Sequence, residues 1–179
     1  MGVPVHFPCW QVKKKLESYD KPMANPRVLI LGKSDISSQN VGGSNGTEVW
    51  WTWDVQCNID FGFVHDTETD PSHIQINMDC WAEIIFIGAA QQGGSGRTSL
   101  QGIFRINGGT TQRKGTIRNY SRGVNYGNLS PALITLVRLV PGDYIEVGTR
   151  VDDSDGVYVI NTSGNELNED ESILTIKLL

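Results

Sequence analysis

The side chains best suited to hold a metal ion lie around one short loop. His65 and His73 stand at its ends, and Asp66, Glu68 and Asp70 lie between them. Imidazole and carboxylate groups are common ligands of zinc and calcium. This spacing matches no compact pair of ligands, and acidic loops are usually solvated. We therefore expect no metal ion at this loop.

A second acidic stretch, from Asp152 to Gly156, is similar to the start of a calcium-binding loop. Such a loop ends on a glutamate at about its twelfth position, where it binds the ion through both carboxylate oxygens. Counted from Asp153, that position is Gly164. The missing ligand favours a turn, and we predict no metal site here.

The motifs of covalent and cofactor-dependent catalysis are absent from the sequence. Gly93-Gly94-Ser95-Gly96 lacks the residue that a nucleophile elbow has between its serine and its last glycine. Phosphate loops and dinucleotide-binding fingerprints do not occur, and nothing selects two carboxylates that converge. We therefore predict no catalytic residues, no cofactor and no enzymatic activity.

Charge is distributed unevenly along the chain, which has a net charge of −5. From Ile84 to Gly142 seven residues are basic and none is acidic, whereas nine acidic residues follow from Asp143 onward. One interpretation is that these charges neutralise one another across adjacent strands of one subunit. The other is a basic patch formed by Arg113, Lys114, Arg118 and Arg122.

Such a patch would bind an anionic partner. The partner could be the acidic loops of the next subunit, Asp152 to Asp155 and Glu166 to Glu171, or a polyanionic glycan on a cell surface. Nucleic acid is not expected, because the negative net charge repels a polyanion and the patch belongs to no nucleic-acid-binding motif.

Composition indicates a globular protein with many turns. The 179 residues are 39% hydrophobic and 20% charged, and twenty are glycine. No apolar run reaches the ~18 residues of a membrane helix, and the first residues lack the pattern of a signal peptide. The odd number of cysteines, Cys9, Cys57 and Cys80, does not suggest a disulfide framework. We expect synthesis in a reducing cytoplasm, with Cys57 and Cys80 as buried thiols.

Two regions are expected, an arm over residues 1–33 and a single head over residues 34–179. Pro4, Pro8, Pro22 and Pro26 interrupt the first region, which has too few apolar residues to form a core. We expect this N-terminal arm to become ordered against a partner or a neighbouring subunit. Near its end, Val28 to Leu31 could form a first strand.

The clearest secondary-structure pattern is the alternation from Val49 to Phe63. Every second residue is apolar, and the residues between them are mostly polar. A period of two predicts a long strand, or two strands joined at a bend, with one dry face. The residues of that face would be Val49, Trp51, Trp53, Val55, Cys57, Ile59, Phe61 and Phe63.

A second alternation runs from Ile74 to Phe86, and its later part is apolar on both faces. From Trp81 onward, Ile85 and Ile87 add apolar side chains to the opposite face. A strand of this kind lies between two packed layers or in a subunit interface. After the strand expected from Leu100 to Ile106, Asn107-Gly108-Gly109 predicts a hairpin turn.

The last third of the chain contains three expected strands. Leu133 to Val140 is almost wholly apolar, Pro141-Gly142-Asp143 turns the chain, and Tyr144 to Val151 leads away. After a loop rich in Gly and Asp, the chain ends on the apolar strand Ile173 to Leu179. That strand must be paired inside a sheet, because a free apolar strand invites aggregation.

From roughly Ser72 to Leu179, this order of strands and turns resembles the globular heads of the tumour necrosis factor and complement-q superfamily. The resemblance implies an all-β jelly roll that assembles as a homotrimer and binds partners. With the other elements, we expect a sandwich of about eight to ten antiparallel strands. Our candidates for the threefold interface are Trp81, Ile85, Ile87, Tyr144 and Tyr158.

These features favour a non-enzymatic virion protein of a tailed bacteriophage, made in the host cytoplasm. It would decorate the capsid or form a head fibre or the tip of a tail spike or fibre. The arm would dock on other virion proteins, the head would contact a host receptor or glycan, and no membrane would be bound. The alternatives are a cellular ligand or adhesion module of the resembled superfamily, and a carbohydrate-active jelly-roll protein.

Overall fold

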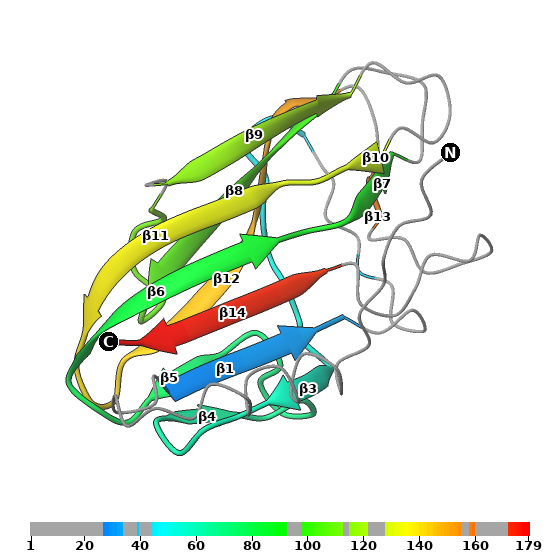
Figure 1. Ribbon diagram of the computed structural model, residues 1–179. Helices are drawn as coiled ribbons and strands as arrows, with labels where there is room; N and C mark the ends of the chain where they lie inside the picture. Colours follow the sequence, from blue (N-terminus) through cyan, green and yellow to red (C-terminus); the bar gives the residue numbers. More distant parts are fainter. Residues whose placement is uncertain are drawn as a thin grey trace, which may run out of the picture.

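The computed structural model describes residues 27–33, 39, 44–92, 98–112, 115–121, 128–154, 158–159 and 172–179. These residues form fourteen β-strands and no helix (Figure 1). Accordingly, no helix in the described ranges could cross a membrane. The predicted arm lies outside these ranges up to residue 26.

One layer of the sandwich, here called the β6 layer, contains five antiparallel strands. In spatial order they are β3 (Val55–Asn58), β1 (Arg27–Gly32), β14 (Ile173–Leu178), β6 (Cys80–Ile87) and β11 (Ala132–Leu139). Figure 1 shows β1, β14, β6 and β11 side by side at the front. The terminal strand β14 lies between β1 and β6 and is paired with both, so the prediction that it is paired inside a sheet is confirmed.

The other layer, here called the β12 layer, lies behind the first (Figure 1). Its spatial order is β9 (Thr116–Ser121), β8 (Thr98–Ile106), β12 (Tyr144–Ser154), β5 (Ile74–Ile76) and β4 (Phe63–His65), with β2 (Glu48–Trp50) also paired to β12. Strand β9 pairs with both β8 and β11, and thereby joins the two layers along one side. A small separate sheet contains β10 (Asn128–Leu129), β7 (Ala90–Gln92) and β13 (Tyr158–Val159).

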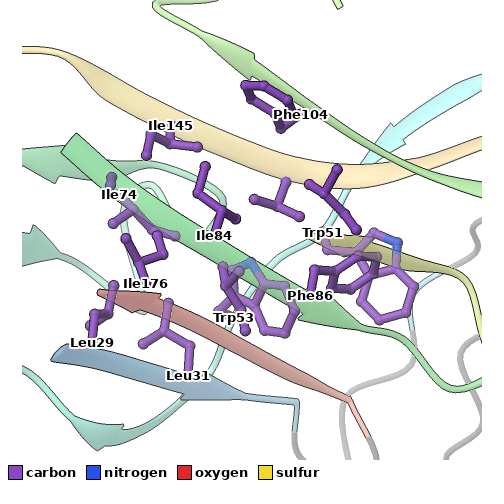
Figure 2. Packing of buried hydrophobic residues seen from close by; sticks show 14 of the residues in the cluster. Leu29, Leu31, Trp51, Trp53, Ile74, Ile84, Phe86, Phe104, Ile145 and Ile176 are labelled. Atoms are coloured by element: carbon purple, nitrogen blue, oxygen red, sulfur yellow. The ribbon is translucent and has the colours of Figure 1, made fainter. Parts of the chain in front are cut away.

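The core fills the space between the layers (Figure 2). Phe86 from the β6 layer meets Trp51 edge-on, with ring centroids 4.9 Å apart, and also lies against Trp53. Both tryptophans are fully buried in the segment that connects β2 of one layer with β3 of the other. Burying each such side chain stabilises the fold by roughly 1.5–3 kcal/mol. The predicted all-β jelly-roll sandwich is confirmed.

The turns occur where the sequence predicts them. Asn107 and Gly108 have positive φ values of 53° and 62° after β8, as a tight hairpin turn requires. Between β11 and β12, Gly142 has a φ of 95°, and the Asp143 carboxylate accepts a hydrogen bond from the amide of Val140.

The stretch from Val49 to Phe63 differs from the predicted strand. It is divided among β2, β3 and the start of β4, because the chain crosses from one layer to the other at Trp51 to Asp54 and again after Asn58. The alternation therefore lapses, and Ile59 and Phe61 are 41% and 75% exposed rather than on a dry face.

The structure differs from two further expectations, namely the boundary of the arm and the free thiol at Cys57. Strand β1 is hydrogen-bonded to β14 within the sheet, so residues 27–32 belong to the head and not to the arm. Cys80 is a free buried cysteine, but Cys57 is disulfide-bonded, so the expectation of a free thiol is wrong at Cys57.

Candidate functional site

Strand β6 divides its side chains between the core and the outer surface of its layer. Cys80, Ala82, Ile84 and Phe86 are buried against the β12 layer. The alternate residues point the other way, because successive side chains of a strand face opposite sides. Among these, Trp81 and Ile87 are about half exposed and Ile85 is partly exposed.

The strands on either side of β6 continue this outer surface. The register aligns Ala132, Ile87 and Ile173 in one row across β11, β6 and β14, and Ile134, Ile85 and Thr175 in the next. Further along, Arg138 pairs with Trp81, whose carbonyl oxygen accepts a hydrogen bond from the amide of Leu179. We call this surface the apolar face, with the members Trp81, Ile85, Ile87, Ala132, Ile134, Leu136, Ile173 and Leu179.

The apolar face leaves large side chains in contact with solvent in a single chain. The most exposed are Leu179 at 61%, Ile134 and Leu136 at 54% each, Ile87 at 50% and Trp81 at 48%. Scattered exposed apolar residues are ordinary, but a contiguous group over three adjacent strands is typical of an interaction surface.

Charged side chains cross the middle of the apolar face. Glu83 on β6 lies in register between Leu136 and Lys177. Arg138 forms an ion pair with Asp79 at 2.5 Å, with both side chains at least half exposed. Opposite charges on neighbouring strands offset one another, so the face carries little net charge to repel a second apolar surface.

A cavity of about 340 Å³ opens beside the apolar face, between β8 and β11. It lies where β9 no longer bridges these strands, since β9 pairs with β11 only at Ala132 and Leu133. Its lining residues are Phe104, Ile106, Thr110, Gln112, Thr135, Leu136 and Val137. Leu136 belongs to both features, so the apolar face continues around β11 into this cavity.

The outer surface of the β12 layer is polar, with its charges paired. Arg105 donates two hydrogen bonds to the Glu146 carboxylate from the neighbouring strand, one of them at 2.7 Å, although Glu146 is only 2% exposed. Arg105 also lies over the ring of Trp50, 4.3 Å from its centroid. Arg150 pairs with both Glu48 and Asp152. Of these contacts, the pair of Arg105 and Glu146 is an instance of the cross-strand neutralisation considered from the sequence.

The predicted interface residues do not all lie together. Trp81, Ile85 and Ile87 are neighbours on the apolar face. Tyr144 lies on β12 in the other layer, where its ring stacks on His73 with centroids 4.4 Å apart. Tyr158 is in β13, and its side chain is outside the described residues.

Sequence reasoning missed the contributions of β11 and β14 to the apolar face. Both were predicted as strands, but the side of each that faces outward was not assigned. Leu133 to Val140 is apolar at nearly every position, as is the stretch from Trp81 to Ile87. This pattern indicates a strand with two apolar faces and could have identified the outward side chains of β11.

Three members of the predicted basic patch, Arg113, Lys114 and Arg122, lie outside the described residues. Arg118 is in β9, and its side chain is also not described. The patch therefore stays a prediction.

The two histidines of the acidic loop are engaged separately. His65 contacts Gln56 and the carbonyl oxygen of Pro71, whereas His73 approaches Glu146 at 3.4 Å. Within the described ranges, no three histidine, cysteine or acidic side chains are grouped as metal ligands would be.

Comparison with known proteins finds a similarity of fold but none of sequence. No protein-family model matches the chain, and no curated protein sequence matches it. Among solved structures, Eiger TNF from S. frugiperda is 8% identical, covers 86% of this chain and 92% of its own, and has a TM-score of 0.53. The chain thus has the jelly-roll fold of a TNF protein.

Two further structures are similar at lower scores. Murine APRIL at pH 5.0 is 13% identical, with coverages of 86% of this chain and 99% of its own and a TM-score of 0.47. The globular domain of zebrafish complement 1qA is 8% identical, with coverages of 84% and 94% and a TM-score of 0.46.

Proposed function

We propose that the chain is a non-enzymatic binding module that works as a homotrimer and assembles through the apolar face. The observation that carries this proposal is the contiguous group of half-exposed apolar side chains on β6, β11 and β14. Covering it with a second copy would remove apolar surface from water, which gains about 25 cal/mol for each Å² buried. That the assembly has three copies is inferred from the resemblance of the sequence to the tumour necrosis factor and complement-q superfamily.

A second copy is the occupant that these features favour. The face and the cavity beside β11 are continuous through Leu136, so one neighbour could cover both. The charged groups on the face include both signs, which suits a partner surface of mixed charge, such as another copy of the chain offers, better than a strongly charged partner. The polar outer surface of the β12 layer would remain in water, where its paired charges are compatible with solvent.

We further propose that the assembled heads form part of a virion surface, as capsid decoration, head fibre or spike tip, with residues 1–26 as the docking segment. Support comes from the jelly-roll fold and from the four prolines that interrupt the sequence of this segment. Finding the protein on purified particles, at a copy number that fits their symmetry, tests this setting. Its absence from particles would contradict it.

A cellular ligand or adhesion module is the second candidate. The observation that favours it is the disulfide-bonded state of Cys57, because such bonds persist mainly outside the reducing cytoplasm. Both candidates use the same homotrimer and differ in where the protein is found.

Leu136→Glu tests the role of the apolar face. Leu136 is 54% exposed and shared with the cavity, so the variant should fold, but assembly would bury an unpaired carboxylate. We expect the association constant to fall at least about tenfold, a change of roughly 1.4 kcal/mol. Light scattering after size exclusion measures it.

The matched control is Val64→Glu, which alters a side chain of similar exposure, 49%, on β4 of the other layer. This variant should assemble like the parent. Equal assembly of the Leu136 variant and the parent over a tenfold dilution would contradict the proposed interface.

A further inference from the structure

The sandwich has an open side opposite β9, where the two ends of its strand path lie. The path begins at β3 in the β6 layer and ends at β4 in the β12 layer, and these two strands are not paired with each other in the described structure. One side chain connects them. The amide nitrogen Nε2 of Gln56 on β3 lies 3.0 Å from the carbonyl oxygen of His65 on β4 and 3.1 Å from Nδ1 of the same residue.

The second ring nitrogen of His65 defines its protonation state. Nε2 lies 3.1 Å from the carbonyl oxygen of Pro71, and a carbonyl oxygen can only accept, so Nε2 carries the hydrogen. Nδ1 is then free to accept a hydrogen bond from Gln56 when the imidazole is neutral. The Pro71 oxygen also accepts from the backbone amide of Trp53, which attaches this loop to the core.

Protonation of His65 is incompatible with this arrangement. A hydrogen on Nδ1 would face the donor group of Gln56, and that hydrogen bond would be lost. If the Gln56 amide rotated to present its oxygen to Nδ1, its nitrogen would leave the His65 carbonyl. Either way, one of the two bonds that connect β3 with β4 is broken.

The surroundings also oppose a charge on His65. The residue is 8% exposed, and its partners from other segments, Gln56 and Pro71, are uncharged. Burial lowers the pKa of His65 below its ordinary 6.5, although the Pro71 hydrogen bond and the neighbouring Asp66 act in the opposite direction. The other acidic residues of the loop, Glu68 and Asp70, are exposed to water.

We propose that the contact between Gln56 and His65 is an acid-sensitive latch, that is, a contact that holds β3 and β4 together at the open side of the sandwich while His65 is neutral. The inference does not depend on the proposed trimer, because the latch lies on the side away from β9 and β11. Protonation of His65 frees the loop 66–72 and the edge of β4 that faces β3, beside the exposed side chains of Phe61 and Val64, while β4 stays paired with β5 on its other side.

The sign of the pH dependence follows from the lowered pKa. Above 6.5, His65 is neutral in both the closed and the opened state, and the latch contributes its full stability. As the pH falls below 6.5, the opened state gains protons first, so the closed state becomes progressively less favoured. The loss is complete once the pH lies below the lowered pKa of the closed state.

Hydrogen exchange of the backbone amides tests the latch. In the parent protein, protection of β4 and of residues 66–72 should fall several-fold between pH 7.5 and pH 5.5, after correction for the intrinsic rates. His65→Gln keeps a donor toward Pro71 but cannot titrate, so its protection should be equal at the two pH values.

His73→Gln is the control at the other end of the loop. His73 faces Glu146, beside Arg105 and Tyr144, and takes no part in the contact between Gln56 and His65. This variant should retain the acid response of the parent. Equal protection of the parent at both pH values would overturn the proposal, as would an undiminished acid response in His65→Gln.

Nuclear magnetic resonance of the parent alone supplies a measurement that needs no variant. The side-chain amide of Gln56 should change its chemical shift with the same midpoint as the His65 ring. A His65 ring that titrates while the Gln56 amide signal stays constant would also overturn the latch.

Discussion

At the scale of single residues, the buried carboxylate of Glu146 shows how the polar surface of the β12 layer is stabilised. It lies near the start of β12, directly opposite Arg105 on β8, and is almost fully removed from water. A carboxylate in that position needs a partner that supplies charge and hydrogen bonds together. The Arg105 guanidinium supplies both, because two of its nitrogens reach the two carboxylate oxygens.

Arg105→Met should therefore destabilise the fold. The variant keeps the aliphatic part of the side chain but leaves Glu146 without its main partner. Breaking a fully buried pair lowers the free energy of unfolding by about 3–5 kcal/mol. Because Arg105 is 27% exposed, we expect a smaller loss of about 2 kcal/mol in the free energy of unfolding, measured with denaturant.

The matched control is Arg138→Met, whose ion pair with Asp79 is exposed. Its loss should be roughly 0–1 kcal/mol, as for other surface pairs. Equal stability of the two variants would show that the Glu146 carboxylate does not depend on Arg105.

At the scale of secondary-structure elements, alternation and turn residues were sufficient to predict β11, β12, β14 and the turns that follow β8 and β11. These elements follow from local chemistry, since a period of two defines a strand and Asn-Gly or Pro-Gly defines a turn. The division of Val49 to Phe63 among three strands could not be predicted from alternation and turn residues. Its crossings between layers depend on pairing with β1 and β12, which are distant in the sequence.

The apolar face could be predicted only in part, because it combines residues of β6 with residues of neighbouring strands. Trp81, Ile85 and Ile87 were identified because β6 is apolar on both faces. The contributions of Ile134 and Ile173 depend on register, which places them beside β6 and which the sequence alone does not specify.

A close contact between β2 and β12 offers a test of this element packing. At Gly148 a Cβ atom would lie 2.2 Å from the carbonyl oxygen of Val49 and 3.0 Å from the Cα atom of Trp50. Both are backbone atoms, so one strand would have to move. Gly148→Ala should lower the free energy of unfolding by about 1–3 kcal/mol, the usual effect of overpacking, as measured by thermal and denaturant unfolding.

Gly32→Ala is the matched control on β1. There a Cβ atom would lie 3.6 Å from the side chain of Val55, which is an ordinary contact. We expect a change within about 0.5 kcal/mol. If Gly148→Ala were equally harmless, β2 would not lie against β12 as closely as described.

At the scale of the whole molecule, the two outer surfaces of the sandwich differ in character. The surface of the β12 layer carries paired charges that are compatible with water, whereas the surface of the β6 layer carries the apolar face. This asymmetry indicates which side of the head would be covered and which would remain available to a partner. In the proposed function, assembly covers the apolar face and the surface of the β12 layer is left for partner binding.

The most direct test of this account is the mass of the full chain in solution. Sedimentation velocity at micromolar concentration should show one species with three times the mass of a single chain, because the apolar face is covered only in the assembly. A species with the mass of one chain over the whole micromolar range would contradict the central claim that the apolar face is an assembly surface.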